Sequence, residues 1–253
     1  MNAKGPESVK ARAIANTDRD VLEEYGRGEW PLKWVSKAEN GNFLEPNEMA
    51  KRHGVCGDPN VAASESDNWY GTATDNWNVL ETVQQAQVLN ITMGMHIYHH
   101  GHVEFFICNT DEALVPDGIP TQECFNEYPL TRAMDDGHAS PIDPQYPGRY
   151  YVDPQCRADE TDQSKPDGAM EDAYVMTARY QLPSDLLCDH CLLQMVYYTG
   201  NDCKHEGYDG FNSISWPTGC ASDKESWIDS DLPLCGDPGA YPEEFWSCAD
   251  LRI

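Results

Sequence analysis

Ten cysteines restrict the fold of this 253-residue chain more than any other feature of its sequence. They are even in number and spread from Cys56 to Cys248, in a chain that also holds 17 prolines and 19 glycines. Such a pattern is typical of a disulfide framework, and disulfides persist mainly in oxidising compartments such as the extracellular space. The sequence therefore predicts a secreted protein with long disulfide-bridged loops, although spacing does not reveal which cysteines pair.

Three short segments bear on this prediction. Cys188-Asp189-His190-Cys191 could also be a zinc-binding or redox C-x-x-C, but the chain has no second pair of this spacing to complete a zinc site. Asn90-Ile91-Thr92 is an N-glycosylation sequon, which agrees with secretion. Residues 1–15 carry charges and no apolar run of signal-peptide length, so we expect the true amino terminus to lie upstream or a signal to have been removed.

The charge of the chain excludes several classes of partner. Its formal net charge is -26, from 17 Lys and Arg against 43 Asp and Glu. Nucleic acid needs cationic partners, and anionic membrane surfaces attract basic segments, so neither is expected to bind. No apolar stretch approaches membrane-spanning length either. A neutral partner, or a salty environment that screens the self-repulsion, is compatible with this charge.

Short apolar and β-branched runs separated by turn residues predict an all-β protein. We expect strands at residues 83–89, 91–98, 103–108, 174–182, 192–198 and 249–253, a loop insertion at 134–169 and cysteine-held loops at 202–241. The length suits one domain with an ample core. Many short strands joined by long bridged loops predict a single antiparallel β-sandwich over residues 1–253.

Four of the eight histidines lie within seven residues, from His96 to His102. A strand, a short exposed bend and a second strand at 103–108 would display these imidazoles at the bend. Imidazole is a good ligand for copper, zinc, iron and nickel, so the cluster suggests a metal site. A polar surface loop without a ligand is the competing interpretation.

Five segments, in this order along the chain, carry a resemblance to a known family: 53–58, 99–108, 121–130, 188–201 and 245–253. Together they resemble the lytic polysaccharide monooxygenases, copper enzymes that oxidise crystalline polysaccharides, and most of all the branch described in invertebrates and some viruses. One such match would be weak, whereas five in register are specific.

The resemblance implies an immunoglobulin-like or fibronectin III-like β-sandwich with a flat copper face. In the family, an N-terminal His binds copper through its amine and ring, and a second His supplies a third nitrogen; alignment gives this role to His99. Phe245 matches the aromatic residue at the axial position, although it could equally be plain core. His96, His100 and His102 are expected to support the site or lie at the surface rather than bind copper.

The resemblance further implies oxidative cleavage of insoluble polysaccharide, chitin or cellulose, by hydroxylation of a sugar C–H bond. The expected partners are that polysaccharide and an external electron donor, and the expected form is a secreted monomer. The choice between chitin and cellulose, and between C1 and C4 oxidation, stays open. Trp69, Tyr70, Trp77 and Trp216 are candidates for stacking on sugars or for the core.

The chain departs from the family at its front, where it begins with Met1 instead of His. Gly5-Pro6-Glu7-Ser8 resembles the family's early segment, which predicts a His immediately before Met1. Cleavage after Lys51-Arg52 would instead expose His53-Gly54. The family cysteine expected at His53 is missing, and we predict a new disulfide between Cys156 and Cys203.

Two other classes compete with the copper enzyme. With half of a copper site, the same sandwich could serve as a secreted, non-catalytic polysaccharide-binding module. A hydrolase built on paired carboxylates has no supporting spacing. Glu243 and Glu244, beside Phe245, could orient oxygen species, but solvated loop carboxylates are the favoured interpretation. Tyr197 and Tyr198 are expected to serve packing.

Overall fold

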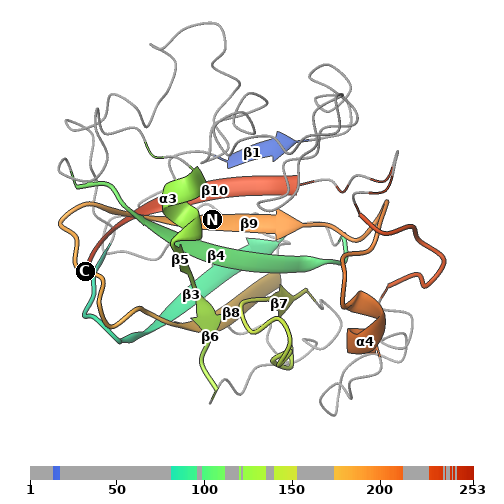
Figure 1. Ribbon diagram of the computed structural model, residues 1–253, viewed down its shortest axis with the longest axis horizontal. Helices are drawn as coiled ribbons and strands as arrows, with labels where there is room; N and C mark the ends of the chain where they lie inside the picture. Colours follow the sequence, from blue (N-terminus) through green and yellow to red (C-terminus); the bar gives the residue numbers. More distant parts are fainter. Residues whose placement is uncertain are drawn as a thin grey trace, which may run out of the picture.

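Two β-sheets form the body of the protein in the computed structural model (Figure 1). The structure describes residues 14–17, 81–95, 99–111, 120, 122–134, 140–152, 174–212, 228–235, 237, 240, 242 and 244–253. The larger sheet has the order β1-β10-β9-β4-β5, with β2 beside β10 and β7 beside β4. Its strands are β1 (Ile14–Thr17), β2 (Glu81–Thr82), β4 (His102–Asn109), β5 (Tyr128–Pro129), β7 (Tyr150–Tyr151), β9 (Cys191–Tyr198) and β10 (Glu244–Arg252).

The smaller sheet has the order β3-β8-β6 and crosses the larger one at an angle in Figure 1. Its strands are β3 (Val88–Met95), β8 (Tyr174–Gln181) and β6 (Thr131–Arg132). Most neighbours in both sheets are antiparallel, and the short contact between β2 and β10 is parallel. The prediction of an all-β antiparallel sandwich is therefore confirmed.

The main hydrophobic core lies between the two sheets. Alternate residues of a strand point to opposite faces, so every second residue of each long strand enters this core. From β4 these are Val103, Phe105 and Ile107, and from β3 they are Leu89, Ile91 and Met93. The rings of Phe105 and Tyr180, one from each sheet, meet edge to face with centroids 4.9 Å apart.

The outer face of the larger sheet is also covered, which the alternating pattern alone does not reveal. All eight residues of β4 are buried, including those that point away from the core. Helix α3 (Gln122–Asn126) covers one end of this face, tied by the Cys108–Cys124 disulfide and by two reciprocal hydrogen bonds between the buried amides of Gln122 and Gln194 (2.8 and 3.1 Å). Helix α4 (Tyr208–Asn212) covers the other end, where Tyr208 contacts His102.

The strands β4, β8 and β9 confirm the predictions for 103–108, 174–182 and 192–198. The predicted strand at 83–89 is wrong, because a turn with a positive φ at Ala86 separates β2 from β3. β10 is longer than the predicted 249–253 and begins at Glu244. Within the predicted insertion, residues 140–152 include β7, which pairs with β4, while 135–139 and 153–169 lie outside the described residues.

The observed disulfides do not include the predicted pair of Cys156 and Cys203. Cys203 pairs with Cys235 and not with Cys156, because two backbone hydrogen bonds of Lys204, to Pro233 and Cys235, bring these segments together. Cys188 and Cys191 form a disulfide and are both buried, so the zinc interpretation is wrong and burial opposes a redox role.

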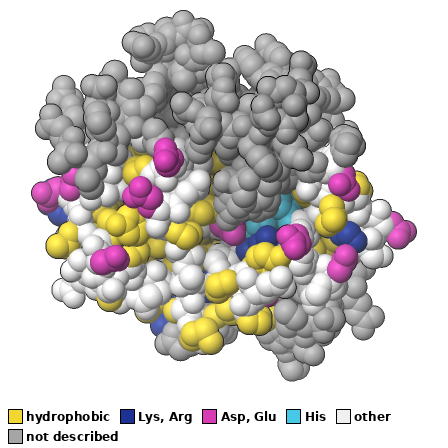
Figure 2. Space-filling view, in the orientation of Figure 1, with side chains coloured by type: hydrophobic (Ala, Val, Ile, Leu, Met, Phe, Trp, Pro, Cys, Tyr) yellow, Lys and Arg dark blue, Asp and Glu magenta, His cyan; other side chains and the backbone are white. Residues whose placement is uncertain are grey.

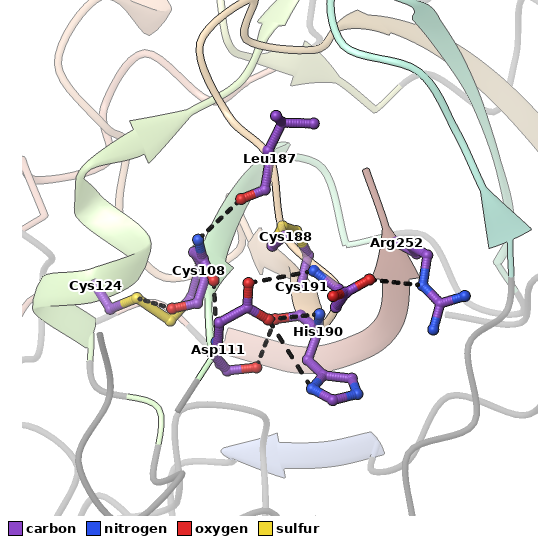
Figure 3. The surroundings of a disulfide bond; sticks show 11 residues. Cys108, Asp111, Cys124, Leu187, Cys188, His190, Cys191 and Arg252 are labelled. Carbon is purple, nitrogen blue, oxygen red and sulfur yellow. Dashed lines mark hydrogen bonds and ion pairs between the residues drawn. A yellow bond between two sulfur atoms is a disulfide. The ribbon is translucent and has the colours of Figure 1, made fainter. Parts of the chain in front are cut away.

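The Cys188–Cys191 loop is fixed by neighbouring chain segments (Figure 3). The carboxylate of Asp111 accepts the backbone N–H groups of Asp189 (3.2 Å) and His190 (2.8 Å), and Arg252 pairs with Asp189 at 3.4 Å. Cys248 is also disulfide-bonded.

Acidic side chains are scattered over the face visible in Figure 2, as expected from the net charge. Among the described residues, no helix is long and apolar enough to cross a membrane.

Candidate functional site

The site begins at the tight bend that leads into β4. His100 and Gly101 both have positive φ, 56° and 82°, a region that side chains with a Cβ rarely adopt. A Cβ at Gly101 would collide with the backbone carbonyl of Tyr198. Gly101 is therefore needed for close approach of the bend to the end of β9, and this approach sets the position of His99.

His99 is half-buried and is held by the turn that follows β9. The N–H of Gly200 donates to the carbonyl of His99 (2.8 Å), and the side-chain amide of Asn201 lies 2.5 Å from Nδ1 of the ring. A hydrogen bond at one imidazole nitrogen orients the ring and determines where the other nitrogen faces.

Phe245, at the start of β10, lies next to His99. Their ring centroids are 6.0 Å apart with an interplanar angle of 44°. Phe245 also stacks on Tyr197, its partner in the β9–β10 ladder, at 5.6 Å and 22°. The two residues predicted for the site from the sequence are thus neighbours, although Phe245 also packs against the hydrophobic core.

The amino-terminal strand flanks the same position. β1 pairs antiparallel with β10, and Asn16 is the register partner of Phe245. An early segment of the chain therefore lies beside the strand that carries the aromatic ring.

A buried polar row runs behind the site on the outer face of the larger sheet. Strand register aligns Glu244, Tyr198, His102 and Tyr151 across β10, β9, β4 and β7. Glu244 is 1% exposed and accepts a hydrogen bond from Trp246 Nε1 (2.9 Å), so the expected solvated loop carboxylate is wrong for this residue. Glu244 lies on the face of the sheet opposite Phe245, so its burial depends on what covers that outer face.

His102 belongs to this row and is completely buried. Its Nδ1 lies 2.5 Å from the hydroxyl of Tyr208, and its Nε2 lies 3.8 Å from Glu104. The edge of the His205 ring meets it at a centroid distance of 5.0 Å. His102 is therefore part of a buried network and not a surface histidine.

The charges of this network shift several pKa values. Burial raises the pKa of the Tyr198 phenol well above its usual value, and the nearby carboxylates of Glu104 and Glu244 raise it further. Burial is the largest single influence on the pKa of Arg149 and lowers it, but the charge of Glu104, 3.9 Å away, together with Tyr208 and Tyr151, more than offsets burial and the net shift is upward. Tyr198 is thus held neutral and Arg149 charged.

The described residues can supply part of a copper site. A histidine nitrogen is a ligand that copper favours, and His99 is anchored at one ring nitrogen as metal-binding histidines usually are. Among the described residues, no group of three His, Cys, Asp or Glu side chains is placed to hold a metal. The part of the chain that the structure describes therefore fits copper as one imidazole ligand beside an aromatic ring.

Several residues considered from the sequence lie outside the described part: His53, Trp69, Tyr70, Trp77, His96, Trp216 and Glu243. Sequence reasoning missed the contacts of Asn201 and Tyr197 with the His99 bend. Both residues lie within a segment that carries the family resemblance, but only the turn geometry reveals what they touch.

The structure defines a disulfide-bonded β-sandwich in which His99 lies beside Phe245. Residues 4–251 match the family model described as "Lytic polysaccharide mono-oxygenase, cellulose-degrading", and the chain belongs to this family. It is a copper-dependent monooxygenase, of a family that acts on insoluble polysaccharide with an external reductant. The resemblance inferred from the sequence is therefore confirmed for the family and for its copper-dependent activity.

A solved structure, "Lytic Polysaccharide Monooxygenase AA15 from Thermobia domestica in the Cu(I) State", is similar to this chain at 18% sequence identity. The alignment covers 87% of this chain and 89% of that chain, with a TM-score of 0.48. No curated protein matches the chain.

Proposed function

We propose that this enzyme cleaves chitin or cellulose oxidatively, and that His99 would hold the copper ion with Phe245 packed beside it. The observation that carries the proposal is the 6.0 Å approach of these two rings. They lie far apart in the sequence, and one is anchored by the β9 turn while the other stacks on Tyr197.

Bound copper would supply the one-electron chemistry that activates an oxygen species toward a sugar C–H bond. The chain's own residues have a simpler task. His99 would hold the metal through one nitrogen, and Asn201 would keep the ring in a fixed orientation. Phe245 would cover one side of the site with an apolar ring, which limits the access of additional ligands there.

We also propose that residues 1–253 form one domain, with an insertion at 134–169, that is secreted and acts as a monomer. The disulfides support secretion, because they persist in oxidising compartments. The family description names cellulose, while the resemblance read from the sequence includes chitin, so both are substrate candidates.

The test uses protein produced from its complete coding sequence. Isothermal titration calorimetry measures copper affinity, and mass spectrometry detects oxidised oligosaccharides released from chitin or cellulose with an added reductant. His99→Ala should abolish tight copper binding and product formation. His190→Ala is the matched control, because His190 is a partly exposed histidine directly before β9, whereas Phe245 pairs with Tyr197 near the other end of that strand.

Unchanged copper affinity in His99→Ala would refute the assignment of the ligand. Binding to insoluble glycan that is indifferent to a chelator, without oxidised products, would favour the non-catalytic binding module instead.

A further inference from the structure

We propose that Tyr197 is the positioning residue of this copper site, and that it fixes the His99 bend and Phe245 at the same time. This inference rests on the proposed function, because it takes His99 and Phe245 as site residues. It replaces the expectation that Tyr197 serves packing alone.

The hydroxyl of Tyr197 is hydrogen-bonded to the bend on two sides. It donates to the carbonyl of His100 (2.6 Å) and accepts the backbone N–H of His99 (3.2 Å). The peptide group before His99 and the peptide group after His100 are therefore both hydrogen-bonded to one side-chain oxygen. Because His100 has a positive φ, this bend is an uncommon conformation that needs such outside support.

The ring of the same residue supports Phe245. Tyr197 and Phe245 are directly opposite each other in the antiparallel β9–β10 pair and stack at 5.6 Å. Directly opposed aromatic residues are a stabilising cross-strand pair. Tyr197 is 6% exposed and packs into the main core, so its own position is fixed by the sandwich.

One rigid side chain therefore relates the two rings of the proposed site. Its hydroxyl fixes the position of the backbone that carries His99, and its ring provides the surface on which Phe245 stacks. Loss of the hydroxyl should change copper binding even though Tyr197 does not contact the metal in this scheme.

The experiment compares Tyr197→Phe, Tyr197→Leu and Tyr180→Phe with the full chain produced from its complete coding sequence. Tyr180→Phe is the matched control: it removes a buried tyrosine hydroxyl bonded to a backbone carbonyl, that of Gly148 (3.1 Å), from a strand of the other sheet. The readouts are copper affinity by calorimetry, the electron paramagnetic resonance spectrum of bound Cu(II), and thermal stability.

Tyr197→Phe is expected to weaken copper binding about tenfold, within the range for residues that orient metal ligands, and to shift the resonance spectrum. Tyr197→Leu, which also loses the stack on Phe245, should shift the spectrum further. Tyr180→Phe should lose similar stability with unchanged copper affinity and spectrum.

Equal copper affinity and spectra for Tyr197→Phe, Tyr180→Phe and the unmodified protein would overturn the proposal. If His99→Ala still abolishes binding in that case, only the role of Tyr197 fails. If His99→Ala binds copper normally, the proposed site itself fails.

A different observation concerns Asn90, from which we infer an N-glycosylation site. Asn90-Ile91-Thr92 is the sole N-x-[ST] sequence in the chain. Asn90 is exposed on β3, whereas its neighbours Leu89 and Ile91 point into the core. Asn90 lies five residues before Met95, the last residue of β3, which is about 16 Å along the strand. A glycan on Asn90 would therefore lie away from the end of β3 that leads toward His99.

In this modification the side-chain nitrogen of Asn90 bonds to the anomeric carbon of an oligosaccharide, loses one proton, and displaces the lipid diphosphate that carried the sugar. The inference rests on the proposed secretion. Secreted full chain from insect cells should lose a glycan mass on treatment with peptide N-glycosidase, and Asn90→Gln should be secreted without it.

Thr92→Ser and Thr92→Val form a matched pair, because only the serine keeps the hydroxyl that the sequon requires. Glycan on the serine variant and none on the valine variant is expected. An unmodified mass in secreted protein with formed disulfides would overturn the inference.

Discussion

Replacing Gly101 with alanine tests whether the bend before β4 depends on a missing side chain. Gly101 has a φ of 82°, and a Cβ there would meet the Tyr198 carbonyl and two backbone atoms of Thr199. The left-handed conformation costs a residue with a Cβ about 1–2 kcal/mol, and relieving a steric overlap in a packed region costs about 1–3 kcal/mol.

We therefore expect Gly101→Ala to lower the free energy of unfolding by about 3 kcal/mol. For a chain of this length this corresponds to a fall in Tm of about 10 °C. Copper affinity should also fall, because the backbone shift that relieves the overlap moves His99 relative to Phe245. Differential scanning calorimetry and copper titration measure the two effects.

Gly210→Ala is the matched control, because a Cβ at Gly210 meets nothing within 4 Å and the residue lies in helix α4. Alanine is preferred to glycine in a helix, so this change should leave Tm unchanged or raise it slightly. A Tm for Gly101→Ala within about 1 °C of the unmodified protein, with equal copper affinity, would refute the reasoning about the bend.

Three further predictions concern the outer face and the loops. Gln194→Leu leaves the buried Oε1 of Gln122 without the donor that it has in the native protein and should cost about 1–3 kcal/mol in urea denaturation, whereas the double change to leucine should cost much less; equal losses would contradict the pairing. Because the folded pKa of Tyr198 is raised, its stabilising contribution is present below about pH 10 and is lost above it. Tyr198→Phe should reduce the loss of unfolding free energy above that pH. An unchanged dependence of the unfolding free energy on pH would contradict this role of Tyr198. Replacing Cys203 and Cys235 with serine reopens a loop with a sequence separation of 32 and should cost about 4 kcal/mol, measured by denaturation; a negligible loss would contradict a stabilising bridge.

Local patterns predicted the central strands well. β4, β8 and β9 fall within one residue of their predicted bounds, because apolar alternation and nearby turn residues coincide there. The first half of β10 was missed because Glu244 is polar, and its burial depends on what covers the outer face. The residues next to Glu244 in the sequence do not indicate that other segments cover the outer face of the sheet.

The site was predictable in its parts but not in its arrangement. His99 and Phe245 followed from the resemblance, while their proximity follows from strand register between β4, β9 and β10. The burial of His102 was not predictable from the sequence, because its neighbours Tyr208 and His205 lie more than 100 residues further along the chain. Such contacts leave no local pattern.

The two faces of the larger sheet should respond differently to random mutagenesis. On the inner face, one aliphatic or aromatic group can replace another of similar volume at small cost, since contacts there are non-directional. On the outer face, where Glu104 pairs with both His102 and Arg149, a single change leaves a buried charged or polar group without its ion-pair partner and should be rescued mainly by a second change nearby. A library of double variants should therefore show strong epistasis on one side of this sheet and near-additivity on the other.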